Sequence, residues 1–228
     1  MFLSSTGIVF SKEVLHSSVS PEFPDGLHAQ YLKYMANKLD VDLKITPLPF
    51  ARRLIELKNG HLDLIAGVHH YASPDESFII LQPSYESIKN TVFVKLQDQY
   101  KMTSVDIFKT STFAVTIRGS YFPELSLNDR PKTVSVSTLK QKIGLLEKGR
   151  VDGFVHFAAS THKLLETLES EITIVPALYQ PEARRNYFFG LSKLSKFTSR
   201  QAEIERIIIT GKQNGDFRKI REDYYSNK

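Results

Sequence analysis

A spacing that occurs twice constrains this chain most. Leu57, Gly60 and Asp63 follow one another at intervals of three, and the same residue types recur at 146, 149 and 152. In each copy an apolar residue precedes the aspartate and a short apolar run follows it. Glycine adopts the left-handed conformation that commonly ends a helix, and a short apolar run is typical of a strand buried on both faces. Two such units, one in each half of the chain, predict two similar α/β lobes.

The remaining periodicities predict alternating helices and strands. Helical spacing or helix start signals predict helices at 27–39, 50–60, 104 onward, 138–149, 160–168, 199–211 and 216–225. Apolar runs and alternation predict strands within 7–15 and at 41–48, 62–66, 91–95, 113–117, 132–136, 151–155, 172–175 and 187–191, and 78–81 is a further apolar segment. We expect 16–26, rich in serine and proline, to be a loop. No linker stands out, which favours lobes joined by crossing strands.

Bulk properties exclude several classes of function. The 228 residues include no cysteine, so neither a disulfide framework nor a thiolate metal site is expected. The net charge of +5 comes from scattered side chains rather than a basic stripe, so we expect no nucleic-acid partner. No apolar run is long enough to cross a membrane. The start of the chain does not resemble a signal peptide, so we expect either a cytoplasmic protein or a form whose signal has been removed.

Candidate ligand contacts follow the buried strand predicted at 62–66. His69, His70 and Tyr71 come directly after it, at the carboxyl edge where α/β proteins bind ligands. The alternative is that they are surface loop residues. Adjacent histidines with no third ligand in the sequence do not indicate a metal site, and we predict none.

The helix that Pro49 opens contributes two more candidates. Phe50 is either a stacking wall for a ligand or a core residue. Of the consecutive Arg52 and Arg53, one should face inward and the other solvent. We take Arg52 as the ligand contact, with a surface or ion-paired role as the alternative.

In the second half, Arg118, Gly119, Ser120 and Tyr121 follow a buried strand. A strand that runs into Gly-Ser at a helix start exposes backbone N–H groups to an anion, so we predict ligand contacts here, with an ordinary turn as the alternative.

Three further candidates are Tyr85, His156 and Phe157, for which lobe packing is the alternative. Phe23 and Tyr121 could enclose a ring. Because Asp63 and Asp152 recur at strand starts, we expect them to be structural. We assign no catalytic residue.

Several short motifs carry a family resemblance. In order they are Gly26-Leu27, Pro49 to Leu54 leading to Gly60 and Asp63, Gln82 to Tyr85, Gly119 to Tyr121, Gly149 to Asp152, and Asn214 to Ile220. The ordered set resembles an extracytoplasmic solute-binding protein of the amino-acid-binding type (family 3), the periplasmic component of importers. The resemblance covers nearly the whole chain.

This resemblance implies a type II periplasmic binding protein fold, in which two Rossmann-like α/β lobes are joined by two crossing hinge strands and close on a ligand. It implies a first lobe at 1–93 plus 190–228, a second at 94–189, and crossings at 91–95 and 187–191. It further implies a periplasmic monomer that binds a small molecule, needs no cofactor, and partners an ABC permease or a membrane sensor.

Two departures from the family pattern concern the ligand. Where such proteins usually carry Thr-Pro-Glu-Arg, whose arginine holds the ligand carboxylate, this chain has Ser73-Pro74-Asp75-Glu76. Where they carry an aspartate for the ligand's ammonium group, it has His156-Phe157. A carboxylate cannot replace a guanidinium in this role. We therefore predict a small polar ligand, anionic or aromatic, that is not a standard free amino acid.

Two other functions remain open. An enzyme on the same fold, such as a cyclic-acid dehydratase, would need a general acid or base. His69, His70, His156 and Glu76 are available, but no spacing pairs them and no Gly-rich phosphate loop is present. We therefore predict that the chain is not an enzyme. A module that binds another protein is the second alternative.

Overall fold

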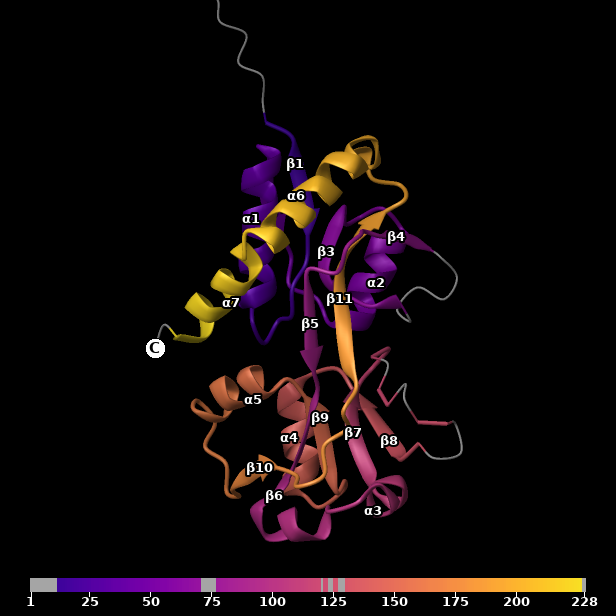
Figure 1. Ribbon diagram of the computed structural model, residues 1–228, viewed down its shortest axis with the longest axis vertical. Coiled ribbons are helices and arrows are strands. Elements are labelled where there is room, and N and C mark those ends of the chain that lie inside the picture. Colours follow the sequence, from indigo (N-terminus) through magenta and orange to yellow (C-terminus); the bar gives the residue numbers. More distant parts are fainter. Residues whose placement is uncertain (1–11, 71–76, 120, 123–124, 127–129, 227–228) are drawn as a thin grey trace, which may run out of the picture.

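Two α/β lobes, stacked along the long axis of the molecule, make up the fold (Figure 1). The computed structural model describes residues 12–70, 77–119, 121–122, 125–126 and 130–226. No helix among these residues is long and apolar enough to cross a membrane. The predicted α/β class with two lobes is therefore confirmed.

The first lobe contains the first and the last described segments of the chain. Its strands are β1 (Val14–Ser17) and β2 (Asp42–Ile45), which pair in parallel, with β3 (Leu64–Val68), β4 (Phe78–Ile80) and the end of β11 (Arg184–Ser192). Its helices are α1 (Leu27–Leu39), α2 (Phe50–Lys58), α6 (Gln201–Gln213), α7 (Asp216–Ser226) and the 3-10 helix η4 (Lys196–Arg200). The predicted helices at 27–39 and 50–60 are both present. The first strand begins later than expected, and residues 1–11 lie outside the described part.

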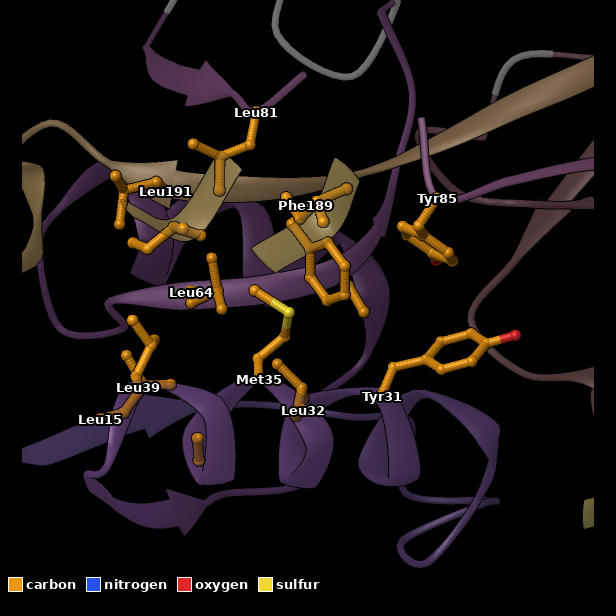
Figure 2. Close-up of a cluster of buried hydrophobic side chains, with 14 of the residues drawn as sticks. Leu15, Tyr31, Leu32, Met35, Leu39, Leu64, Leu81, Tyr85, Phe189 and Leu191 are labelled. Carbon is orange, nitrogen blue, oxygen red and sulfur yellow. The ribbon is translucent and has the colours of Figure 1, made fainter. Parts of the chain in front are cut away.

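The core of this lobe forms where α1 packs against the sheet (Figure 2). Leu32, Met35 and Leu39 recur at intervals of three and four, so they share one helix face, and all are buried. That face meets Leu64 of β3 and Phe189 of β11, both fully buried. The helical spacing in the sequence thus fixes which side of α1 faces the sheet.

The second lobe is a five-stranded sheet in the order β10-β6-β9-β7-β8. The strands are β6 (Thr91–Lys95), β7 (Thr112–Thr116), β8 (Lys132–Val136), β9 (Gly153–His156) and β10 (Ile174–Pro176). The helices are α3 (Val105–Thr110), α4 (Leu139–Glu147), α5 (Ala158–Leu165) and the 3-10 helix η2 (Leu96–Lys101). Thr138 caps α4 in a capping box with Gln141, as the sequence predicted for Ser137 or Thr138.

The repeated motif has the same structure in both lobes. Gly60 and Gly149 adopt φ values of 78° and 64°. The Asp63 carboxylate accepts a hydrogen bond from His16 N–H at 2.8 Å, and that of Asp152 accepts one from Thr112 N–H at 2.7 Å. Each aspartate therefore ties the start of its own strand to another strand of its lobe, β1 for Asp63 and β7 for Asp152, which is a structural role.

Two antiparallel strands pass between the lobes, and one of them differs from the prediction. The crossing strands are β5 (Glu86–Lys89) and the first part of β11, where Arg184 to Tyr187 pair with Lys89 to Glu86. β6, expected to cross, pairs with β9 and β10 inside the second lobe. The sequence of β5 gives little strand signal because most of its side chains are only half-buried. The passage between lobes thus lies a few residues before each predicted boundary.

Candidate ligand-binding cleft

A cavity of about 520 Å³ lies between the lobes and is lined by both of them and by the crossing strands. The first lobe contributes Phe23, His28, Phe50, Arg53, His69 and Tyr85, among others. The second contributes Thr116, Gly119, Tyr121, Ser137, His156 and Phe157. The crossing strands add Ile88, Lys89, Arg184, Arg185 and Tyr187. A cavity of this size and position accommodates a small molecule.

Arg53 is the most constrained charged group in the cavity. Its side chain projects from α2, only 5% of the residue is exposed, and its guanidinium carbon lies 5.1 Å from the centre of the Phe50 ring. Its Nε and Nη1 atoms are buried and find no hydrogen-bond acceptor among the described residues. Burial lowers the pKa of Arg53 to about 10, so the group stays protonated at neutral pH. A buried guanidinium with two unsatisfied nitrogens is stabilised by an anion that enters the cavity.

Arg52, the predicted contact, does not line the cavity. Its side chain is 61% exposed, and Nη2 lies 2.6 Å from the Glu56 carboxylate one turn along α2. Successive helix residues are rotated by about 100°, so the two arginines diverge. Arg53 precedes Leu57 by four positions and shares its buried face. That spacing was the signal that could have identified Arg53.

A second cationic region surrounds Tyr121. The Arg185 guanidinium carbon and the Lys142 ammonium lie 5.5 Å and 5.7 Å from the centre of its ring. Burial alone would raise the pKa of Tyr121, but the Lys142 ammonium, the hydrogen bonds at Thr116 and the Arg185 guanidinium together lower it. Lys142 is fully buried and donates to the Val155 carbonyl at 2.8 Å. Sequence reasoning missed both cations, since Lys142 lies within a helix and Arg185 precedes the expected strand.

The carboxylates that line the described part of the cavity are Glu22 and Glu86, and both already accept hydrogen bonds. Glu22 accepts from the backbone N–H groups of Leu139 and Lys140. Glu86 forms an ion pair with Arg221 and accepts a hydrogen bond from the Tyr31 hydroxyl at 3.1 Å. Positive charge therefore exceeds negative charge among the described lining residues.

Three histidines add polar but uncharged surface. Burial, and secondly the Arg53 guanidinium, lower the pKa of His28 to about 3. Burial, and secondly Arg185, lower that of His69 to about 4. Burial, and secondly Lys142, hold the pKa of His156 well below its usual value. All three are neutral at pH 7 and can exchange hydrogen bonds with a polar ligand.

The other predicted contacts divide into three groups. Those that line the cavity are Phe50, His69, Tyr85, Gly119, Tyr121, His156 and Phe157. Those that do not are Arg52, His70 and Arg118. Tyr71 and Ser120 lie outside the described residues, as does the stretch 73–76. His70 is exposed, and its ring lies edge-on to Phe188 at 4.6 Å because the chain is leaving β3 there. A role of any of these residues in binding stays a prediction.

The helix start that the sequence predicted at Gly119 is not seen among the described residues there. Arg118 and Phe122 both have φ values of 59°, in the left-handed region, and the described residues from 117 to 122 form a turn and irregular backbone. Left-handed residues cannot begin a right-handed helix. The described residues between 117 and 122 therefore offer no helix start to an anion, although Gly119 lines the cavity.

Residues 17–227 match the family of bacterial extracellular solute-binding proteins, family 3. The chain belongs to this family. This agrees with the predicted resemblance, and also with the prediction that the chain is not an enzyme, because the family consists of binding proteins. A curated relative is the probable amino-acid-binding protein YxeM of Bacillus subtilis, 23% identical over 207 residues, which are 88% of this chain and 76% of that protein.

Solved structures of other binding proteins share the fold. The substrate-binding protein AbpA of Streptococcus pneumoniae, bound to L-arginine, has a TM-score of 0.74 and 18% identity over 93% of this chain and 94% of its own. The P235GK mutant of ArgBP from T. maritima also gives 0.74, with 19% identity over 94% and 96%. The GluR0 ligand-binding core with L-glutamate gives 0.75, with 15% identity over 96% and 100%. At these identities the likeness establishes the two-lobed fold alone.

The described residues contain no group of three or more His, Asp or Glu side chains arranged to hold a metal ion.

Proposed function

We propose that this family 3 protein binds a small organic carboxylate between its lobes, and that Arg53 holds the carboxylate. The observation that carries the proposal is the burial of the Arg53 guanidinium, with two nitrogens that have no acceptor among the described residues. Guanidinium and carboxylate groups match in a two-bonded geometry, and such a pair is strong where water is excluded. Phe50, over which the guanidinium lies, supplies an apolar wall beside it.

The charge of the cleft supports a ligand other than a standard free amino acid. An α-ammonium group needs a carboxylate or several free acceptors. Glu22 and Glu86, the carboxylates of the described lining, are engaged by backbone N–H groups and by Arg221. Arg185 and Arg53 instead favour a ligand with net negative charge.

The biological role we propose is delivery of this solute to an ABC permease or a membrane sensor, as a periplasmic monomer. Family membership supports a place outside the cytoplasm. Two lobes that close on a ligand present a changed surface to such a partner.

A thermal-shift panel tests the ligand class. It contains carboxylates without an ammonium group (acetate, succinate, benzoate), α-amino acids (glutamate, glutamine, arginine), and uncharged amides (succinamide, benzamide). A ligand at 100 times its dissociation constant stabilises by about 2.7 kcal/mol, a shift on the order of 5–10 °C at this size. We expect a shift with a carboxylate and none with its amide. Shifts with α-amino acids alone would overturn the exclusion of amino acids, and equal shifts with acids and amides would overturn the role of the carboxylate.

A further inference from the structure

A side chain of the first lobe caps a helix of the second. Glu22, in the loop after β1, accepts hydrogen bonds from Leu139 N–H at 2.7 Å and Lys140 N–H at 2.8 Å. These donors belong to the first turn of α4, where backbone N–H groups have no partner within the helix and the helix dipole favours negative charge. The two oxygens of one carboxylate thus connect the lobes directly.

The C-terminal helix makes a second connection between the lobes. In Figure 1, α7 of the first lobe descends towards α5 of the second. The Tyr225 hydroxyl lies 3.0 Å from Ser160 Oγ, and the Lys163 ammonium donates to the Tyr224 carbonyl at 3.1 Å. The same ammonium lies 4.0 Å from the centre of the Tyr224 ring. All these contacts use protein atoms alone and therefore need no ligand.

We infer that Glu22 and Tyr225 form an interlobe latch that favours the closed cleft in the absence of ligand, with Glu22 as its stronger element. Both belong to the first lobe, and their partners move away when the lobes separate. Glu22 is the stronger element because its two hydrogen bonds are charge-assisted, whereas the Tyr225 contact is between neutral hydroxyls. The latch also sets ligand affinity, since a ligand that needs the closed cleft binds in proportion to the closed fraction. The affinity part rests on the proposed function.

The closed fraction can be measured without a ligand. Because the chain has no cysteine, the pair Asn37→Cys and Lys148→Cys labels one exposed position in each lobe for single-molecule fluorescence transfer. We compare this labelled protein with the same protein carrying Glu22→Ala, Glu22→Gln or Tyr225→Phe. Asp98→Asn is the control, because Asp98 pairs with Lys101 inside the second lobe.

We expect Glu22→Ala to lower the closed-to-open ratio by about tenfold, and Glu22→Gln and Tyr225→Phe to lower it less, with Asp98→Asn unchanged. Closed fractions in Glu22→Ala and Tyr225→Phe equal to that of the parent would overturn the latch.

A second arm measures affinity for succinate or benzoate, whichever binds in the panel. The dissociation constant should rise by the factor by which the closed fraction falls. An unchanged affinity in a variant with a reduced closed fraction would overturn the affinity part. Failure of every carboxylate to bind the parent protein would overturn the proposed function. The closed fractions measured without ligand would still test the latch.

Discussion

Arg52 and Arg53 are adjacent in α2 but lie in opposite environments. Arg52 is exposed and pairs with Glu56 at 2.6 Å, whereas Arg53 is buried in the cleft with two nitrogens that lack an acceptor in the described structure. The rotation of about 100° between successive helix residues separates a surface ion pair from a buried charge. A protein retains a charge of the second kind at a cost in stability, which a bound anion offsets.

The ligand-free protein should become more stable when this charge is removed. For Arg53→Met we expect an increase of about 1–3 kcal/mol in the free energy of unfolding, because an apolar side chain replaces a buried cation with two nitrogens that lack an acceptor among the described residues. Urea denaturation measures it. Arg52→Met, which loses only a surface ion pair, should change the same quantity by less than about 1 kcal/mol. A loss of stability in Arg53→Met larger than that in Arg52→Met would contradict this account.

The two repeated aspartates should contribute unequally to the stability of the fold. Asp63 is buried and accepts hydrogen bonds from His16 N–H and, at 2.6 Å, from Ser195 Oγ. Asp152 is exposed and accepts from Thr112 N–H. We expect Asp63→Asn to destabilise the fold by about 2–3 kcal/mol and Asp152→Asn by about 1 kcal/mol or less. In Asp63→Asn one of the two buried donors meets the amide NH2 group, which cannot accept a hydrogen bond. Denaturant unfolding measures both losses. Equal losses of stability in the two variants would contradict the argument that burial makes Asp63 the more important residue.

Stability should fall in mild acid because of the buried histidines. In the folded protein the pKa of His28 is lowered to about 3 and that of His69 to about 4, below the value of about 6.5 in an unfolded chain. The unfolded state therefore binds more protons between pH 6.5 and these lower values, so the free energy of unfolding decreases as pH falls through this window. Above pH 7 these histidines are neutral in both the folded and the unfolded protein, so they no longer make the free energy of unfolding depend on pH.

His28→Gln isolates one contribution. Between pH 7 and pH 5 the variant should lose about 1–2 kcal/mol less stability than the parent, since a glutamine does not titrate. Denaturant unfolding at the two pH values measures the difference, and the stability of the two proteins should run parallel above pH 7. An identical loss of stability between pH 7 and pH 5 in parent and variant would show that His28 does not contribute to the acid sensitivity.

Gly67 should tolerate no side chain. It has a φ of +88°, and a Cβ atom there would lie 2.4 Å from His28 Cε1. We expect Gly67→Ala to destabilise the protein by about 2–4 kcal/mol, because backbone strain and a clash add. Gly144→Ala in α4 is the matched control, because a Cβ there meets no atom within 4 Å. It should stabilise by about 0.5–1 kcal/mol through helix propensity. The two thermal midpoints should therefore move in opposite directions.

Much of the fold follows from local pattern. The spacing of Leu32, Met35 and Leu39 predicted α1 with the bounds that the structure has, because one face had to be apolar. The repeated Leu-Gly-Asp spacing predicted two related lobes. In each lobe the glycine adopts a positive φ after a helix and the aspartate accepts a hydrogen bond from a backbone N–H of a neighbouring strand. The crossing strand β5 was missed, since residues that line a cleft between lobes carry no core pattern.

The cleft was predictable only in part. Phe50 was predicted from the start of a helix and His69 and Tyr121 from the ends of strands, and all three line the cavity. Arg52 was preferred to Arg53, although the four-residue spacing from Arg53 to Leu57 places Arg53 on the buried face. Glu22 and Arg185 acquire their surroundings from distant segments, Leu139 and Tyr121, which no local pattern brings together.

The most direct test of the central claim is calorimetric titration of the carboxylate that binds in the panel into the parent protein, Arg53→Met and Arg52→Met. We expect Arg53→Met to weaken binding by about 100-fold or more, because removal of one partner from a buried charge pair costs about 3 kcal/mol or more. Arg52→Met should bind within about threefold of the parent, since a surface ion pair contributes little. Parent-like affinity in Arg53→Met, or an equal loss in both variants, would contradict the assignment of Arg53 as the carboxylate site.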